Sequence, residues 1–409
     1  MNRNNPNRQK VAGIIRFSCG ILSFLFSFCY LYFLQGEILA EAQYVYSGGI
    51  TTYNLLIGAI IISVVLQILQ WIVSKLSKLP PRWYALSYLP SMLALAMITD
   101  INRASIICFS FGDWIWVAPA VIFAYIIIVM IVRRASAEYN FTPHDVWAQA
   151  YPNYIILFAL IIAVGSIPQS SDVYHFELKA ERLILCKDYE GATQVGDESL
   201  QSSARLTQLR MYALSKQGQL ANRLFEYPQY YGSQGLLDVT DMQSDYRFTP
   251  QDICFYLGAV CGKSIKSTYR YYHLMLADSI WNQHTADYYL CALLLDKRMD
   301  EFQHQLPNYY NLADSVPKAY DALPRAFREA FLVIGQPDAA MNGYIVIGND
   351  TLATLSDTAL VQQFREYRTM KASLYDPTER INRTRRQFGK TFWWYYDYSD
   401  KATEELSKQ

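Results

Sequence analysis

The stretch "LLIGAIIISVVLQILQWI" (Leu55–Ile72) decides the fold of the first part of this chain. It contains no charged residue, and its length approaches the roughly 20 apolar residues with which a helix crosses a bilayer. Four further apolar runs also lie before residue 170. The run that begins at Trp83 contains Pro90, and the run that begins at Pro152 is short. We therefore predict a bundle of about five transmembrane helices: Ile14–Leu34, Leu55–Ile72, Trp83–Thr99, Trp114–Val132 and Pro152–Ile167.

Basic residues between these runs predict the orientation of the bundle. Cytoplasmic loops are enriched in Lys and Arg. With five spans, one side of the membrane receives only Arg103, whereas the other receives Arg3, Arg8, Lys10, Arg16, Lys75, Lys78, Arg82, Arg133 and Arg134. The N-terminus is thus expected inside and residues 169–409 outside.

A cleaved signal peptide is the alternative for the first run, because Ala40–Ala42 resembles a small-residue cleavage site. The apolar region of a signal peptide is usually about 7–15 residues long, and this run is longer. We therefore expect an uncleaved helix and two domains, a transmembrane domain at 1–168 and a soluble domain at 169–409.

The charge of the soluble part argues against nucleic acid as a partner. Residues 1–168 hold 10 of the 36 basic and 6 of the 36 acidic residues, which leaves 26 basic and 30 acidic residues after them. Nucleic-acid binding normally requires a basic surface. The lipid bilayer is the partner that the composition does predict.

Repeated helix pairs are suggested by the soluble part. The stretch "AERLILCKDYEGATQVGDESL" has the spacing Lys187-x-Tyr189-x-x-Ala192, which resembles a tetratricopeptide repeat. Weaker copies occur at Gly218-x-Leu220 and Arg298-x-Asp300-x-Phe302. The alternative is a set of unrelated helix pairs, and both interpretations give a mainly α-helical domain. One exception is "GYIVIGND" (343–350), which predicts a strand or hairpin arm.

Three stretches carry a resemblance to a known family: "LAEAQYVYSGGITTYN" (Leu39–Asn54), "LPRAFREAFLV" (Leu323–Val333) and "FGKTFWWYY" (Phe388–Tyr396). The chain resembles an uncharacterised family of Bacteroidetes-type multi-pass inner-membrane proteins with a tetratricopeptide-like C-terminal domain. The resemblance covers the whole length and has no catalytic residues to transfer. It implies a bacterial inner membrane, with a cytoplasmic N-terminus and a periplasmic C-terminal domain.

Motifs for metal, redox or nucleophilic chemistry do not occur in the sequence. No cysteine pair has CxxC spacing, the five histidines form neither HxxxH nor HExxH, and G-x-S-x-G is missing. Cys254 and Cys261 would face the same way on one helix yet lie too far apart to bridge. Free thiols are expected at Cys186, Cys254, Cys261 and Cys291, and one disulfide among these four is the alternative. We predict no catalytic, metal or cofactor-binding residues.

An aromatic stretch near the C-terminus, "TFWWYYDYSD", is the most distinctive local feature. It follows a basic run that contains Arg385 and Arg386. The rings can pack into the domain core, lie with the basic run on the membrane as an interfacial anchor, or form a platform for a sugar. The candidate interaction residues are Trp393, Trp394, Tyr395, Tyr396, Arg385 and Arg386.

Two functions follow as hypotheses. The first is a multi-pass envelope protein whose outer helical-repeat domain is a scaffold for another envelope protein, because helical repeats commonly present concave binding surfaces. The alternative is a membrane protein that binds glycans or handles lipid-linked saccharides. The state of Trp393 and Trp394 separates them: buried rings remove the sugar platform, and exposed coplanar rings favour it.

Overall fold

The computed structural model describes residues 6–101, 112–138, 146–166, 172–239, 247–258, 265, 267–277, 282–310, 320, 322–334, 344–347, 350–354 and 358–406. The chain is mainly α-helical and divides into two compact units, 1–178 and 179–409. The division falls within helix α8 (Asp172–Leu185). The predicted domain boundary at 168/169 lies outside the described residues.

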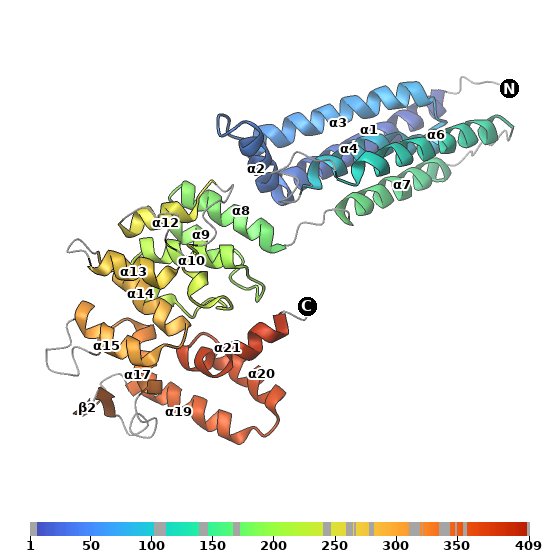
Figure 1. Cartoon of the computed structure of the whole chain (residues 1–409). Coiled ribbons are helices and arrows are strands. Elements are labelled where there is room, and N and C mark those ends of the chain that lie inside the picture. The colour runs from blue at the N-terminus through green and yellow to red at the C-terminus, as the bar shows by residue number, and fades with distance from the viewer. Residues whose placement is uncertain are drawn as a thin grey trace. The chain divides into compact units, whose positions relative to one another are not determined.

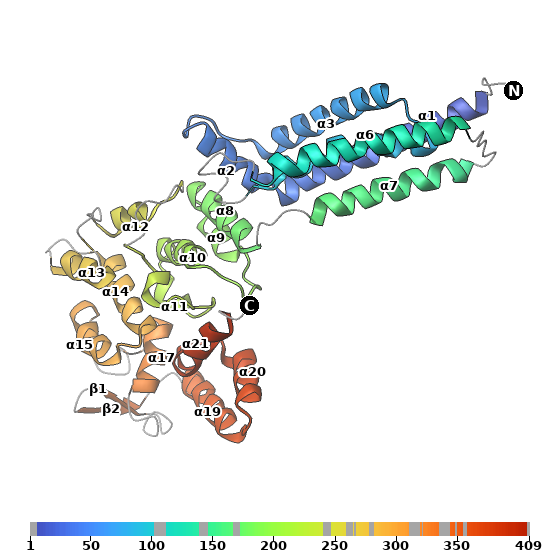
Figure 2. The ribbon, with the colours of Figure 1, turned by 45° about the vertical axis from the view of Figure 1, so that its right-hand side comes forward.

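The first unit is a bundle of long apolar helices (Figures 1 and 2). Four helical segments are long and apolar enough to cross a membrane: Ala12–Leu34, Leu55–Ser77, Trp114–Ala135 and Gln149–Ser166. The described elements of this unit are α1 (Pro6–Cys29), η1 (Tyr30–Leu34), α2 (Gly36–Tyr46), α3 (Leu55–Ser77), η2 (Pro81–Tyr88), α4 (Leu89–Thr99), α6 (Trp114–Glu138) and α7 (Val146–Ser166).

Local signals explain how α3 begins and ends. The Asn54 side chain accepts hydrogen bonds from the Leu56 and Ile57 amides, both at 3.1 Å, and so caps the helix N-terminus. The helix ends at Lys78, whose φ of 47° is left-handed. Between these ends Ile61 and Val65 are exposed, whereas Ala59 and Leu66 are buried. Exposed apolar faces suit a helix that contacts lipid.

The predicted span at Trp83–Thr99 is a broken element rather than one long helix. Its first part, η2, is a 3₁₀ helix that begins at Pro81, and its second part, α4, has only 11 residues. Neither part qualifies alone as a span, so among the described residues four helical segments meet that criterion. Proline explains the break, because Pro81 and Pro90 both lie at a helix start, where the missing N–H costs nothing.

Side chains from other helices satisfy the backbone of the broken element. Asn153 in α7 is fully buried, and its Oδ1 accepts the Ala85 amide at 2.7 Å. Its Nδ2 donates to the carbonyl oxygens of Pro81, at 2.9 Å, and Gln149, at 2.7 Å. Gln70 in α3 donates to the Tyr84 hydroxyl at 2.9 Å. Irregular backbone at membrane depth is tolerated when buried protein groups satisfy it in this way.

The broken element runs antiparallel to α6. Leu79, just before η2, packs with Tyr125 and Val129, more than two turns after the start of α6. At the other end, the Asp100 carboxylate accepts the indole N–H of Trp114, the first residue of α6, at 2.8 Å. The chain therefore passes along the bundle between the end of α3 and the start of α6.

The second unit is built mainly from helix pairs. Its described elements are α8 to its end at Leu185, α9 (Tyr189–Gln194), α10 (Ala204–Lys216), α11 (Leu220–Arg223), η3 (Gly232–Gly235), α12 (Pro250–Leu257), α13 (Thr268–Ala277), α14 (Gln283–Leu295), α15 (Met299–Tyr309), α17 (Arg325–Ile334), β1 (Tyr344–Ile347), β2 (Asp350–Thr354), α19 (Thr358–Ser373), α20 (Pro377–Phe388) and α21 (Phe392–Leu406). The two strands form an antiparallel hairpin in which Val346 pairs with Thr351, at the position predicted from "GYIVIGND".

Three of the helix pairs share one turn. Lys187, Gly218 and Lys297 follow the first helix of α8/α9, α10/α11 and α14/α15 with φ of 63°, 68° and 55°. The amide of the residue after each left-handed residue bonds back in the same pattern: Asp188 to Leu183, Gln219 to Leu214 and Arg298 to Leu293, at 2.8–2.9 Å. This pattern is typical of a helix that ends in a left-handed residue. The three turns are therefore alike in backbone conformation, and they lie at or next to the positions where the sequence pattern suggested repeat copies, the third of them at Lys297, one residue before Arg298.

One cysteine differs from expectation. Cys254 in α12 is disulfide-bonded, whereas Cys186 and Cys291 are free. The free-thiol expectation for Cys254 is therefore wrong. It assumed that one helix carries both Cys254 and Cys261, but α12 ends at Leu257 and Gly258 follows with φ of 127°. Cys261 lies outside the described residues.

Candidate functional site

The aromatic stretch forms the start of α21, and a buried carboxylate holds it there. Glu329 in α17 accepts the Phe392 amide at 2.7 Å with one oxygen and Arg325 Nε at 2.7 Å with the other. Burial raises the pKa of Glu329, and the Phe392 amide and Arg325 oppose that rise. The Glu329 side chain thus accepts one of the amides at the N-terminus of α21 that no carbonyl of the helix can reach.

Trp393 belongs to the core of the second unit. Its side chain is 1% exposed, and its ring lies 5.4 Å from the ring of Phe364 and 6.3 Å from that of Tyr367, both in α19. Trp394 is 6% exposed. Of the three interpretations of this stretch, packing into the core therefore describes both Trp rings, and neither offers an open face on which a sugar could stack.

The single acidic residue among the aromatic ones, Asp397, is also explained by packing. Its carboxylate accepts Lys371 Nζ at 2.6 Å and the Tyr367 hydroxyl. Both partners lie in α19. The interaction therefore fixes α21 to α19 and uses the carboxylate within the fold.

Two other rings of the stretch make polar contacts at their edges. The Trp394 indole N–H donates to Thr384 Oγ1 in α20 at 3.2 Å, and the Tyr395 hydroxyl donates to the Leu295 carbonyl at the end of α14 at 2.6 Å. Tyr396 is half-buried, with Lys297 Nζ 5.8 Å from its ring centroid. These bonds connect α21 to α14 and α20.

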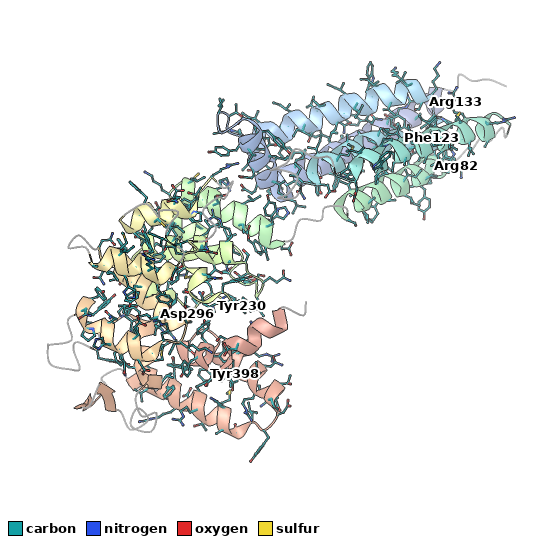
Figure 3. The ribbon with its side chains drawn as sticks, in the orientation of Figure 1. Arg82, Phe123, Arg133, Tyr230, Asp296 and Tyr398 are labelled. Atoms are coloured by element: carbon teal, nitrogen blue, oxygen red, sulfur yellow. The ribbon has the colours of Figure 1, made fainter. Side chains whose placement is uncertain are left out.

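A cavity of about 240 Å³ opens where α20 and α21 face the segment 197–230. We call it the C-terminal cleft and define it by Tyr227, Tyr230, Arg385, Arg386, Lys390 and Trp394, all of which line it. Figure 3 labels Tyr230 on one wall and Tyr398 on the helix that forms the other, where the Tyr398 ring lies tilted against that of Trp394 with the centroids 5.7 Å apart. The cleft therefore joins parts of the chain that are far apart in sequence.

Arg385 connects the two walls of the C-terminal cleft. One of its guanidinium nitrogens donates to the Tyr230 hydroxyl at 2.8 Å, and its Cζ lies 5.4 Å from the centroid of a Trp394 ring. A guanidinium above an indole is an attractive cation–π pair. Arg385 forms no ion pair with a carboxylate among the described residues, so its charge is uncompensated there.

Arg386 and Lys390 add two further positive charges to the cleft. Both side chains are exposed, and within the described part of the chain neither forms a hydrogen bond or an ion pair. The rest of the predicted basic run is engaged elsewhere: Arg380 donates to the Leu374 carbonyl at 2.7 Å, and Arg383 pairs with Glu379 at 2.9 Å. The free cations of the run are thus those that line the cleft.

A buried arginine lies behind the Tyr227 wall. Arg210 in α10 is 1% exposed, and its guanidinium lies 5.1 Å from the centroid of the Tyr227 ring. It donates to the carbonyls of Val195 and Gly196 at 2.6 and 2.8 Å, while its Nε and Nη1 have no partner among the described residues. Burial lowers the pKa of Arg210, and Tyr227 and Asp197 oppose this. Its charge adds to the positive potential of the cleft.

A second cavity, of about 310 Å³, adjoins the cleft, because Phe225, Glu226 and Lys390 line both. It contains two ion pairs, Arg223 with Glu226 and Arg325 with Glu329. Lys390 is therefore the cation that both cavities share. The two cavities are therefore neighbours on the second unit.

The sequence identified only part of this site. Arg385, Arg386, Trp394 and Tyr395 line the cleft as one group, whereas Trp393 and Tyr396 do not line it. Sequence reasoning missed Tyr227, Tyr230 and Arg210. The tyrosines stand in "EYPQYYG", where a proline among aromatic residues is a turn signal, but nothing local indicates that this turn faces α20.

The described residues show no arrangement typical of metal or covalent chemistry. They contain no group of three or more His, Cys, Asp or Glu side chains that can hold a metal ion. The polar groups of the cleft are mostly cations, hydroxyls and amides, which bind and orient a ligand. The arrangement is therefore suited to holding an anionic group against aromatic rings.

Comparison with known proteins gives one match. The model of a protein family of unknown function matches residues 105–261 and 263–399, a range that includes α21 up to Ser399 and most of the cleft. No curated protein and no solved structure matches this chain.

Proposed function

We propose that this chain, which belongs to the family of unknown function DUF6057, is a multi-pass bacterial inner-membrane protein whose outer, tetratricopeptide-like unit is a scaffold for a partner protein. The observation that carries the proposal is the C-terminal cleft, in which Arg386 and Lys390 are exposed and have no hydrogen-bond or ion-pair partner among the described residues, beside the rings of Tyr230 and Trp394 on its two walls. Aromatic residues and arginine are enriched at protein interfaces.

Five crossings follow if η2 and α4 together act as one span. With 8 residues at about 2.0 Å and 11 residues at about 1.5 Å each, the pair extends over about 32 Å, close to the thickness of the hydrocarbon core. The antiparallel course of this element along α6 supports this interpretation. An odd number of crossings puts the helical unit on the side opposite the N-terminus.

The positions of the basic residues agree with that orientation. Arg82 at the start of η2 and Arg133 near the end of α6 lie toward the same end of the bundle (Figure 3). Since Lys and Arg accumulate in cytoplasmic loops, this end is the cytoplasmic one.

The disulfide at Cys254 supports an outer location for the second unit. Disulfides persist in oxidising compartments, of which the bacterial periplasm is one, and are rare in the cytosol. Cys19 and Cys29, in the first candidate span, are free. A periplasmic unit after a cytoplasmic N-terminus accounts for both observations.

The shared turn of the three helix pairs supports the repeat interpretation. Stacked helix pairs bury a continuous core and present an extended surface, which is commonly used to bind proteins. The second helices α9 and α11 have only 6 and 4 residues, so the likeness to a tetratricopeptide repeat is clearest at the turns and in the longer α14/α15 pair.

A photocrosslinking experiment tests the binding role. A benzophenone amino acid replaces Arg386 in the full-length protein in its native membrane, and a matched control replaces Arg383, which lies on the same helix but pairs with Glu379 and does not line the cleft. We expect a defined protein adduct from position 386 and none from 383. Equal adducts from both positions, or none from either, would refute the cleft as a protein-binding site.

The glycan alternative is not favoured by the geometry. It requires open ring faces at Trp393 and Trp394, and both side chains are buried. The interfacial anchor meets the same difficulty, because rings that pack against α19 and α20 are not available to the headgroup region. We therefore propose the protein scaffold alone.

A further inference from the structure

We infer that the partner segment held in the C-terminal cleft is an extended peptide rich in Asp or Glu, an inference that depends on the proposed function. Three cations line the cleft, Arg385, Arg386 and Lys390, and none forms an ion pair within the described part of the chain. Unpaired charges beside a cavity favour a ligand of opposite sign.

The acidic side chains near the cleft do not cancel these charges. Glu226 is engaged by Arg223, with which it forms an ion pair. Asp197 lines the cleft and faces the buried charge of Arg210, whose pKa it acts to raise. An anionic ligand therefore meets a net positive site with one carboxylate, Asp197, whose charge Arg210 offsets.

Arginine geometry favours carboxylates as the ligand groups. A guanidinium presents a planar fork of N–H donors that matches a carboxylate, and Lys390 contributes a point charge at the far end of the cleft. Arg385 is already oriented by the Tyr230 hydroxyl and the Trp394 ring. Less conformational entropy is lost on binding when a donor is held in place beforehand.

The shape of the site favours an extended chain over a compact ion. The cleft and the adjoining cavity share Phe225, Glu226 and Lys390 as lining residues, so an extended chain that occupies both would pass Lys390. Aromatic rings in the walls of the cleft would contact the apolar parts of such a chain. A single phosphate or acetate would occupy only a small part of the two cavities.

A membrane surface is the other anionic partner that basic and aromatic residues suggest. A peripheral membrane anchor exposes its rings and presents its cations on an open face. Here Trp394 is 6% exposed, and Arg385 is turned into the cleft toward Tyr230. The observations therefore favour the peptide.

The test uses fluorescence anisotropy with the full-length protein in nanodiscs. The probe is a fluorescein-labelled decapeptide with four Glu residues among Gly, Ala and Ser, and its control carries Gln in place of each Glu. We expect the Glu peptide to bind at least about tenfold more tightly, with an affinity that falls as salt rises.

Two double variants connect binding to the cleft. Arg386→Glu with Lys390→Glu reverses the free cations and is expected to weaken binding of the Glu peptide by at least about tenfold. Arg365→Glu with Arg383→Glu makes the same change in net charge at exposed positions that do not line the cleft, and is expected to leave binding within about twofold. Arg386→Gln with Lys390→Gln provides a milder variant if reversal impairs folding.

Each outcome decides between explanations. Equal binding of the Glu and Gln peptides, or equal loss in both double variants, overturns the acidic-peptide inference. The inference is overturned in favour of lipid if the protein binds phosphatidylglycerol vesicles but not the Glu peptide, and if the charge reversal at Arg386 and Lys390 abolishes the vesicle binding. If one of these outcomes is found together with a specific protein adduct at position 386, the acidic-peptide inference is refuted and the proposed scaffold function still holds.

Discussion

Replacing Asn153 with Leu tests how the broken element is held in the bundle. The change removes the acceptor of the Ala85 amide and a donor to the Pro81 carbonyl, in a site where Asn153 is fully buried. A buried polar group that loses its partner costs about 1–3 kcal/mol, and side-chain hydrogen bonds within membranes average about 0.6 kcal/mol. For two orphaned groups we expect a loss of about 2–4 kcal/mol.

Such a loss raises the population of the open bundle by a factor of about 30 to 900. Free Cys19 is fully buried in this unit and reports its opening, whereas free Cys291 is fully buried in the other unit. The assay is timed alkylation across a temperature series, with the modification of each cysteine quantified by mass spectrometry. In Asn153→Leu, Cys19 should react at lower temperature than in the wild type and Cys291 should not change.

A matched control is Ser166→Ala in the same helix, which removes an exposed bond to the Ile162 carbonyl. It should leave Cys19 protection unchanged. If Asn153→Leu behaves like Ser166→Ala, or if both cysteines lose protection together, then Asn153 does not stabilise the broken element specifically and the reasoning is wrong.

Three further predictions concern the second unit, with Cys291 alkylation as the readout. Burial raises the pKa of Glu329 in the folded state. The stability linked to its protonation is therefore fully present below the pKa of the unfolded state and is lost as the pH rises through the pKa of the folded state. Lowering the pH from 7 to 4 should thus increase the free energy of unfolding of the wild type relative to that of Glu329→Gln. Lys187 and Gly218 have φ of 63° and 68°, so Lys187→Gly should stabilise the unit and Gly218→Ala should destabilise it, each by about 1 kcal/mol. If both substitutions stabilise the unit, or both destabilise it, the shared turn is refuted. Reduction of the disulfide at Cys254 should cost about 2–4 kcal/mol, and Cys254→Ala should make the unit insensitive to reductant.

Much of the bundle could be predicted from sequence, because a membrane span is a local property of composition. The run Leu55–Ile72 became α3, extended to Ser77, and the runs beginning at Trp114 and Pro152 lie in α6 and α7. The broken element was not predictable in the same way. Its 3₁₀ backbone depends on Asn153, which lies far along the chain and whose contact no local pattern reveals.

The turn shared by three helix pairs could be predicted from residue type at only one of its positions. Gly218 marks a left-handed turn by residue type, whereas Lys187 and Lys297 adopt the same conformation without such a signal. The third predicted repeat copy therefore begins at Arg298, one residue after the left-handed Lys297.

The candidate site shows the same limit. The basic run and the aromatic stretch are adjacent in sequence, and Arg385 and Trp394 do meet. The opposite wall, with Tyr230, is brought to them only by the fold. Which rings face the cleft and which lie in the core follows from the pitch of α21 against α19, a relation that composition does not encode.

The central claim is that the chain crosses the membrane an odd number of times and carries its helical unit to the outer side. The most direct measurement uses full-length chains that end in either alkaline phosphatase or green fluorescent protein, with the N-terminus untouched. The account predicts active phosphatase and no fluorescence, because phosphatase requires an oxidising compartment and green fluorescent protein exported unfolded does not mature there. Fluorescence with inactive phosphatase would mean that the C-terminus lies inside, that η2 and α4 do not cross, and that the cleft faces the cytoplasm.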